Sequence, residues 1–208
     1  MSGLSPLTLE NKRSKVVITP KPDTGTGDTT RIEAVFDNDP DKKAGENVPV
    51  VRVYMLAGIG PNKNTYSGAV QLHVKNPDAG AVKDLRTYDP ANKGKLGYDL
   101  IFSQQEDVQH LARTRNLSVK EATAGYLGQH LDSKELKPNI AQKIDALTGQ
   151  GIIRADVATA VKETIRAIEE TSHTMRHEDG PDQFASRLRP RLERVVASLG
   201  GQSAARGA

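Results

Sequence analysis

Apolar residues follow two different periods along the chain. Between residues 15 and 103 they alternate with polar residues or form short runs rich in Val and Ile, which is the pattern of half-buried strands. From residue 104 onward they recur every three or four positions, as on the buried face of an amphipathic helix. Runs of strands followed by runs of helices are typical of an α+β protein and not of an alternating α/β fold. The sequence therefore predicts an N-terminal antiparallel β module of about five strands, then a C-terminal helical module of about four to five helices.

Clusters of turn residues separate the strand candidates, which cover residues 15–19, 31–36, 48–57, 69–74 and 97–102. The segment 69–74 alternates most clearly. Val70 and Leu72 share one face with Val74, while Gln71 and His73 lie on the opposite face. We expect the first face to pack on the core and the second to meet solvent.

The helix candidates cover residues 104–116, 118–131, 138–149, 154–178 and 181–199. Gly149 suits the residue that follows a helix, and Pro190 predicts a kink or a restart in the last helix. The apolar stripe of the segment 154–178 either closes the helical module internally or, because this helix is longer than its neighbours, packs against a second copy of the chain, and the length slightly favours the second interpretation. The predicted organisation is an N-terminal arm (1–14), a β-rich module (15–103), a helical module (104–199) and a flexible tail (200–208).

Composition excludes several classes of protein. The chain has no Cys, so it cannot be a disulfide scaffold, hold a CxxC metal site or use a Cys nucleophile. It shows no apolar run long enough for a membrane span and no secretory signal at its start, so we expect no membrane association and a cytoplasmic location. The net charge is only +3.

Basic residues gather near the two ends of the chain. Lys12, Arg13 and Lys15 lie near the start. Four arginines lie near the end, at Arg187, Arg189, Arg191 and Arg194. Clusters of this kind suit an acidic protein or the phosphates of a nucleic acid, because each neutralised phosphate adds to the affinity. The simpler interpretation is a pair of solvated ends that aid solubility.

One short segment, residues 111–122, has motif character. Ala112, Asn116, Leu117 and Ser118 match a small packing residue, a turn residue, an apolar residue and a helix cap. In these positions the segment resembles the helix-turn-helix of bacterial DNA-binding proteins. The resemblance implies a helix pair at 108–131 whose second helix turns Val119, Lys120, Thr123 and Ala124 toward the major groove. The alternative is two capped helices that form an antiparallel hairpin.

Three other patterns suggest chemistry but fit simpler interpretations. His173 and His177 have the spacing of two metal ligands on one helix face, yet zinc needs a third ligand from elsewhere. The Gly-rich segment 58–65 follows a strong strand, but Pro61 removes an amide that a phosphate loop would use, so a hairpin loop is favoured. The carboxylates Asp37, Asp39 and Asp41 lack the spacing of a calcium loop.

No pattern brings a nucleophile, a base and an orienting group together, and no cofactor fingerprint is present. We therefore expect a non-catalytic binding and assembly protein that self-associates, such as a viral or phage structural component, without metal or cofactor. Its basic C-terminal segment would contact an acidic protein partner or a nucleic acid, in the cytoplasm or in the virion. Two alternatives stay open: a DNA-binding regulator that uses the helix pair at 108–131, and an enzyme whose site assembles from distant residues.

Overall fold

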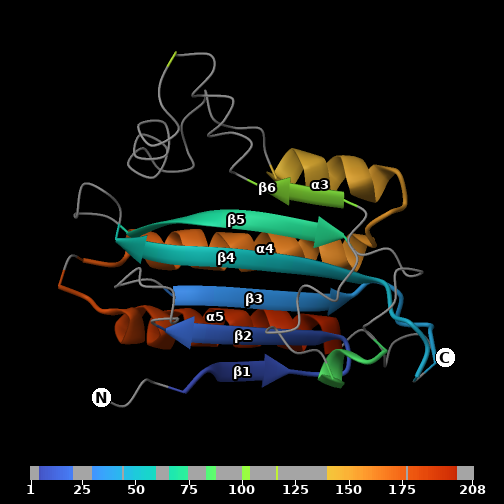
Figure 1. Ribbon diagram of the computed structural model, residues 1–208, viewed down its shortest axis with the longest axis horizontal. Helices are drawn as coiled ribbons and strands as arrows, with labels where there is room; N and C mark the ends of the chain where they lie inside the picture. Colours follow the sequence, from blue (N-terminus) through green and yellow to red (C-terminus); the bar gives the residue numbers. More distant parts are fainter. Residues whose placement is uncertain are drawn as a thin grey trace.

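The computed structural model describes residues 5–20, 30–43, 45–59, 66–74, 83–87, 100–103, 116, 140–176 and 178–200. Six strands form one antiparallel sheet whose spatial order follows the chain: β1 (Leu7–Glu10), β2 (Ser14–Pro20), β3 (Thr30–Asp37), β4 (Val50–Ile59), β5 (Tyr66–Val74) and β6 (Leu100–Ser103). A 3₁₀ turn, η2 (Leu85–Thr87), precedes β6. Three helices follow the sheet in the described part of the chain: α3 (Ile140–Gly149), α4 (Ala155–His173) and α5 (Pro181–Gly200). Figure 1 shows the helices on one face of the sheet.

The predicted α+β class is confirmed, because an antiparallel sheet is followed by helices. The five predicted strand segments correspond to β2 through β6. The strand β1 was missed, because its four residues are too few to show a clear alternation and lie within the predicted arm 1–14. It pairs with β2 in a register that sets Leu9 opposite Val16. The described sheet therefore has six strands.

Three helices are described where the sequence predicts four to five, and the segments 104–115 and 117–131 lie outside the described residues. The helix α4 ends at His173, earlier than predicted. The helix α5 continues through Pro190, where a kink or restart was predicted. Pro190 and Ser186 are both exposed, so water can satisfy the carbonyl oxygen that the proline leaves without a donor.

The end of α3 is closed by Gly151 and not by Gly149, which the sequence had favoured. Gly151 has a φ of 74°, in the left-handed region. The Gly151 amide donates to the Thr148 carbonyl at 3.0 Å, and the Ile152 amide donates to the Leu147 carbonyl at 2.9 Å. This pair of bonds is the Schellman arrangement, which satisfies carbonyl groups at a helix end.

Replacing Gly151 by Ala is expected to lower the free energy of unfolding by about 1 kcal/mol, because a Cβ disfavours the left-handed backbone. No side chain crowds the position, since a Cβ at Gly151 would meet nothing within 4 Å. The same change at Gly149, which has no positive φ, is the matched control and should be neutral or slightly stabilising. Urea denaturation of both variants measures the difference. Equal effects at the two positions would contradict the assignment of the cap.

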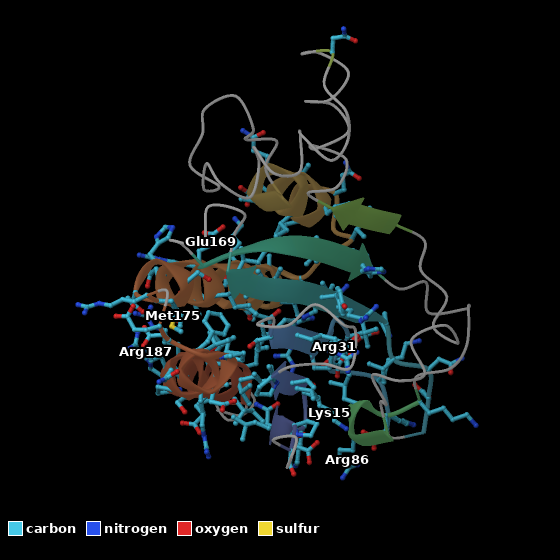
Figure 2. All side chains as sticks on the ribbon, turned by 60° about the vertical axis from the view of Figure 1, so that its left-hand side comes forward. Lys15, Arg31, Arg86, Glu169, Met175 and Arg187 are labelled. Carbon is cyan, nitrogen blue, oxygen red and sulfur yellow. The ribbon has the colours of Figure 1, made fainter. Side chains whose placement is uncertain are left out.

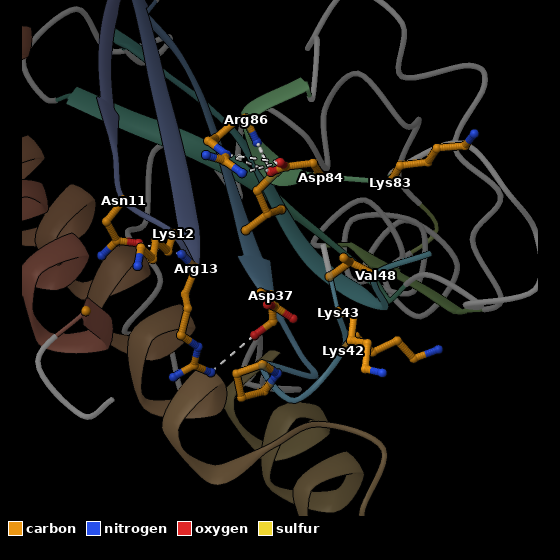
Figure 3. Close-up of a pocket in the computed structure, with 13 residues that line it drawn as sticks. Asn11, Lys12, Arg13, Asp37, Lys42, Lys43, Val48, Lys83, Asp84 and Arg86 are labelled. Carbon is orange, nitrogen blue, oxygen red and sulfur yellow. Dashed lines mark hydrogen bonds and ion pairs between the residues drawn. The ribbon is translucent and has the colours of Figure 1, made fainter. Parts of the chain in front are cut away.

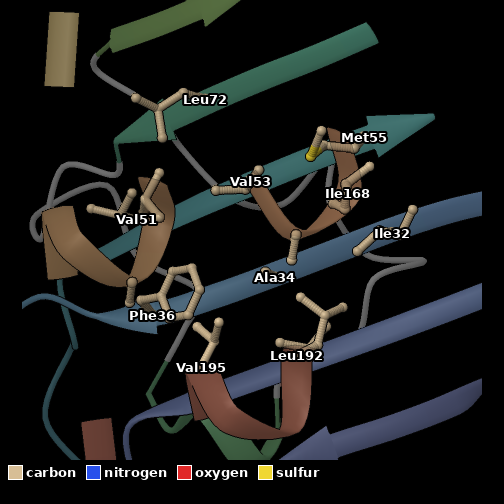
Figure 4. Packing of buried hydrophobic residues seen from close by; sticks show 14 of the residues in the cluster. Ile32, Ala34, Phe36, Val51, Val53, Met55, Leu72, Ile168, Leu192 and Val195 are labelled. Carbon is tan, nitrogen blue, oxygen red and sulfur yellow. The ribbon is translucent and has the colours of Figure 1, made fainter. Parts of the chain in front are cut away.

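One hydrophobic core joins the sheet to the helices. Residues Ile32, Ala34 and Phe36 of β3 alternate onto the helix-facing side, and Val53 of the neighbouring strand joins them. Leu192 of α5 lies against this layer (Figure 4). The predicted β and helical modules therefore share a single core.

The apolar stripe of α4 is covered within the chain. Val157, Val161 and Ile168 are buried in the shared core. Among the residues whose side chains the structure describes, Ile152 is the one large hydrophobic residue that is exposed. The stripe therefore gives no support to packing against a second copy, and self-association stays a prediction. None of the helices in the described part of the chain combines the length and the apolar character that crossing a membrane requires.

The face of the sheet away from the helices carries buried charged groups. Lys15 and Arg31 lie on this side in Figure 2. Glu33 of β3 and Arg52 of β4 form an ion pair there, and their side chains are only 2% and 4% exposed. The Arg52 guanidinium also lies 5.3 Å from the centre of the Tyr54 ring. His73, which the alternation of β5 placed toward solvent, is buried on this face. Polar positions along these strands are therefore not all solvent-exposed.

Candidate anion-binding pocket

A pocket of about 430 Å³ lies where three segments meet beside the C-terminal end of α5. These segments are the β1–β2 turn, the connection from β3 to β4, and the residues around η2 (Figure 3). We call it the basic pocket, because its described lining holds six cationic side chains and two carboxylates. The cations are Lys12, Arg13, Lys42, Lys43, Lys83 and Arg86, and the carboxylates are Asp37 and Asp84. A concave surface with this excess of positive charge attracts anions.

The β1–β2 turn is shaped by the side chain of Asn11. Its Oδ1 accepts hydrogen bonds from the backbone amides of Arg13 and Ser14, both at 2.8 Å, and from the Ser14 hydroxyl at 2.9 Å. Its Nδ2 donates to the carbonyl of Val196 in α5. Asn11 therefore fixes the turn and fastens it to the C-terminal helix, which places Lys12 at the pocket.

Arg13 lies in the pocket wall, and its side chain binds other residues of the chain. Its guanidinium donates to Asp156 Oδ2 at 2.9 Å and to the Asp37 carbonyl at 3.3 Å. Burial acts to raise the pKa of Asp156, but the hydrogen bond and charge of Arg13, followed by those of Arg154, outweigh it and hold that pKa below its ordinary value. Asp156 also lies in the first turn of α4, where the helix dipole favours a negative charge. Arg13 therefore links the hairpin to α4.

The two carboxylates of the pocket differ in their surroundings. Burial raises the pKa of Asp37 above its ordinary value, despite a 2.7 Å hydrogen bond from the Asp39 amide and the positive charge of Arg13. Asp84 is paired with Arg86 through hydrogen bonds of 2.8 and 3.0 Å, and these bonds lower the pKa of Asp84. Arg86 is thus already engaged by a carboxylate.

Among the described residues, the four lysines of the pocket have no such partners. Lys12, Lys42, Lys43 and Lys83 are exposed. Their ammonium groups make no hydrogen bond or ion pair with any residue that the structure describes. Figure 3 shows Lys42, Lys43 and Lys83 extending from the loops that carry them. These four charges are therefore available to an anion from outside the chain.

The arginines singled out in the sequence lie elsewhere, along α5. Three of them bind nearby acids: Arg187 with Asp179 at 3.2 Å, Arg189 with Glu193 at 2.7 Å, and Arg191 with Glu170. Arg194 is exposed and forms no ion pair with the described residues. Most of the charge of this cluster is therefore balanced by acids of α4, α5 and the connection between them.

The helix pair at 108–131, including Lys120, lies outside the described residues except for Asn116. Asn116 has a φ of 52°, the left-handed conformation that suits a residue in a tight turn. The resemblance to a helix-turn-helix therefore stays a prediction, with its turn residue in a suitable conformation.

The structure describes the other sequence candidates only in part. Ile59 of β4 pairs with Tyr66 of the antiparallel strand β5, but residues 60–65 of the Gly-rich segment 58–65 lie outside the described residues, so its interpretation as a hairpin loop stays a prediction. The helix α4 ends at His173, four residues before the second histidine of the spaced pair, which lies outside the described residues. Within the described segments, no group of three His, Asp or Glu residues is placed to hold a metal ion.

The basic pocket is thus the described feature that best suits an external ligand. The sequence pattern marks Lys12 and Arg13 as part of a basic cluster but does not mark Lys42, Lys43 and Lys83, because the three segments are far apart along the chain. The adjacent pair Lys42 and Lys43 in a polar loop was the available signal. Comparison of the chain with protein-family models, with curated proteins and with solved structures gives no match.

Proposed function

We propose that the protein is a non-catalytic binding protein that holds an acidic partner in the basic pocket. The observation that carries this proposal is the presence of four exposed lysines, free of ion pairs with the described residues, in the lining of one concave surface. Such charges steer an anionic partner toward the pocket and contribute to its affinity. The arginines of α5 are weaker candidates, since three of the four are paired with acids.

Self-association is a second part of the proposal. Polar residues alternate along the strands and proline-flanked loops join them, as suits a subunit of an assembly such as a viral or phage particle. The protein would then act in the cytoplasm or in the virion. A mass in light scattering that rises with protein concentration supports this part, and a constant monomer mass contradicts it.

Retention on a heparin column tests binding to an acidic partner. The pocket variant Lys42→Glu/Lys43→Glu is expected to elute at a much lower salt concentration than the wild type, because two attractive charges become repulsive. Its matched control is Arg189→Glu/Arg194→Glu, which changes the net charge equally on α5. The control should elute closer to the wild type.

Two outcomes of this experiment would contradict the proposal. A wild type that flows through at low salt has no useful affinity for polyanions. A control that loses more retention than the pocket variant would move the binding site to α5.

A second candidate function is a DNA-binding regulator, favoured by the left-handed φ of Asn116 in the turn of the predicted helix pair. Lys120 is the basic residue predicted to face the major groove, so Lys120→Glu should abolish sequence-specific DNA binding. It should leave retention on heparin through the basic pocket nearly unchanged. Selection of binding sites from a random DNA library measures the first effect.

A further inference from the structure

We propose that the acidic partner of the basic pocket is a nucleic acid, bound by its phosphate backbone without regard to base sequence. This inference rests on the proposed function, because it names the ligand of the same pocket. The alternative partner, an acidic protein, is an outcome of the test below.

The described lining offers charge but few apolar anchors. Protein partners are usually held by apolar and aromatic side chains that are buried at the centre of the interface. The pocket's Val48 and Leu85 are already buried within the chain, and Pro40 is half-buried. Binding to a phosphate backbone needs no such anchors, because Lys and Arg side chains supply the affinity.

The described lining also lacks the groups that read bases. Asn and Gln side chains recognise bases through paired donors and acceptors, and Asn11 is the one such residue among the described lining residues. Its Oδ1 accepts three hydrogen bonds and its Nδ2 donates to Val196, so it is committed to the fold. The described lining includes no aromatic side chain on which a base would stack.

The arginines of the pocket are likewise engaged. Arg13 binds Asp156, and Arg86 binds Asp84 with several hydrogen bonds. Bidentate recognition of guanine by arginine would require breaking these pairs. The cations that are not engaged by described carboxylates are the four lysines. Each of them acts as a point charge, which is suited to binding phosphate groups.

The four lysines come from three separate segments around the pocket, so they can meet different phosphates of one strand. Each phosphate that is neutralised on duplex DNA contributes about −0.9 to the slope of log K against log salt. Four contacts therefore predict a slope of about −3 to −4.

Fluorescence anisotropy of the full chain with two labelled 20-base-pair duplexes of unrelated sequence, measured over a series of KCl concentrations, tests the inference. The wild type should bind both duplexes with affinities within about twofold of each other, since only phosphates are contacted. The variant Lys42→Ala/Lys43→Ala should lower the affinity about tenfold at low salt and make the slope shallower by about two. Both residues are exposed, so the variant should unfold at the wild-type temperature.

Two further variants sharpen the result. Arg189→Ala/Arg194→Ala removes the same charge from α5 and should leave affinity and slope close to those of the wild type. Asp84→Asn removes a negative charge from the pocket and releases Arg86, so it should tighten binding severalfold and steepen the slope by about one. A tightening variant cannot be explained by partial unfolding.

Several outcomes would overturn the inference. A preference of more than about tenfold for one duplex would mean that bases are read. An equal loss in the α5 control would mean that binding follows net charge and not the pocket. Failure of the wild type to bind either duplex would also overturn it.

Polyglutamate serves as the second probe and separates this inference from the proposed function. If the wild type binds polyglutamate through Lys42 and Lys43 but binds neither duplex, the pocket does hold acidic partners and only the identity of the ligand is wrong. If it binds neither probe, the proposed function fails as well.

Discussion

Replacing Glu33 by Gln is expected to lower the free energy of unfolding by about 3 kcal/mol or more, because it leaves the charge of Arg52 buried without its carboxylate. The two side chains are 2% and 4% exposed, so water cannot replace the lost partner. The reverse variant, Arg52→Met, leaves Glu33 without its cation and should cost a similar amount. Urea denaturation measures both.

The double variant Glu33→Leu/Arg52→Met is the sharper part of this prediction. Removing both charges removes both desolvation penalties, so the double variant should be near wild type in stability or even more stable. The loss of the interaction between Arg52 and the Tyr54 ring acts against this gain, by about 1 kcal/mol. If the double variant loses as much stability as the two single variants together, the pair is not coupled. If each single variant loses less than about 1 kcal/mol, the pair behaves as a solvated ion pair.

The helix-facing half of the sheet could be predicted from the sequence, because alternation of apolar residues directly reports a buried face. The rule applies to Ile32, Ala34 and Phe36, which occupy alternate positions in the predicted strand 31–36 and are buried in the core. The same rule is wrong for the opposite face, because it predicts that the alternate polar residues are exposed to solvent. His73 is buried there, and an ion pair lies beside it. Alternation shows that two faces differ but not that the polar one is exposed.

The basic pocket illustrates a different limit of sequence patterns. Lys12, Lys42 and Lys83 lie in three turns or loops, and none of these forms a motif alone. They meet because the β1–β2 turn, the β3–β4 connection and η2 lie together in the folded chain. The α5 arginines, in contrast, form an obvious cluster in the sequence, yet three of them have acidic partners: one within α5, one on α4 and one in the connection between these helices. The cluster of positive charge in the sequence of α5 therefore overstates how many of these arginines are free to bind an external partner.

Replacing Arg13 by Met is expected to lower the free energy of unfolding by about 2–3 kcal/mol near neutral pH. The side chains of Arg13 and Asp156 are 10% and 14% exposed, so the variant leaves a largely buried carboxylate without its main partner. It also removes the link from the β1–β2 turn to α4. The matched control is Arg154→Met, because Arg154 also contacts Asp156, at 3.3 Å, but is 36% exposed. The control should cost less than about 1 kcal/mol.

The dependence of this loss on pH identifies its cause. The pKa of Asp156 in the folded protein is lower than its ordinary value of 3.8, so the unfolded chain binds the proton more readily. Its contribution to stability is therefore fully present above about pH 5 and disappears as the pH falls through the folded pKa. In the variant the pKa of Asp156 is no longer lowered by Arg13, so the stability curves of variant and wild type should approach each other below about pH 4. A difference that stays constant from pH 7 to pH 3 would show that Arg13 stabilises the fold through the packing of its aliphatic chain and its hydrogen bond to the Asp37 carbonyl, and not through its ion pair with Asp156.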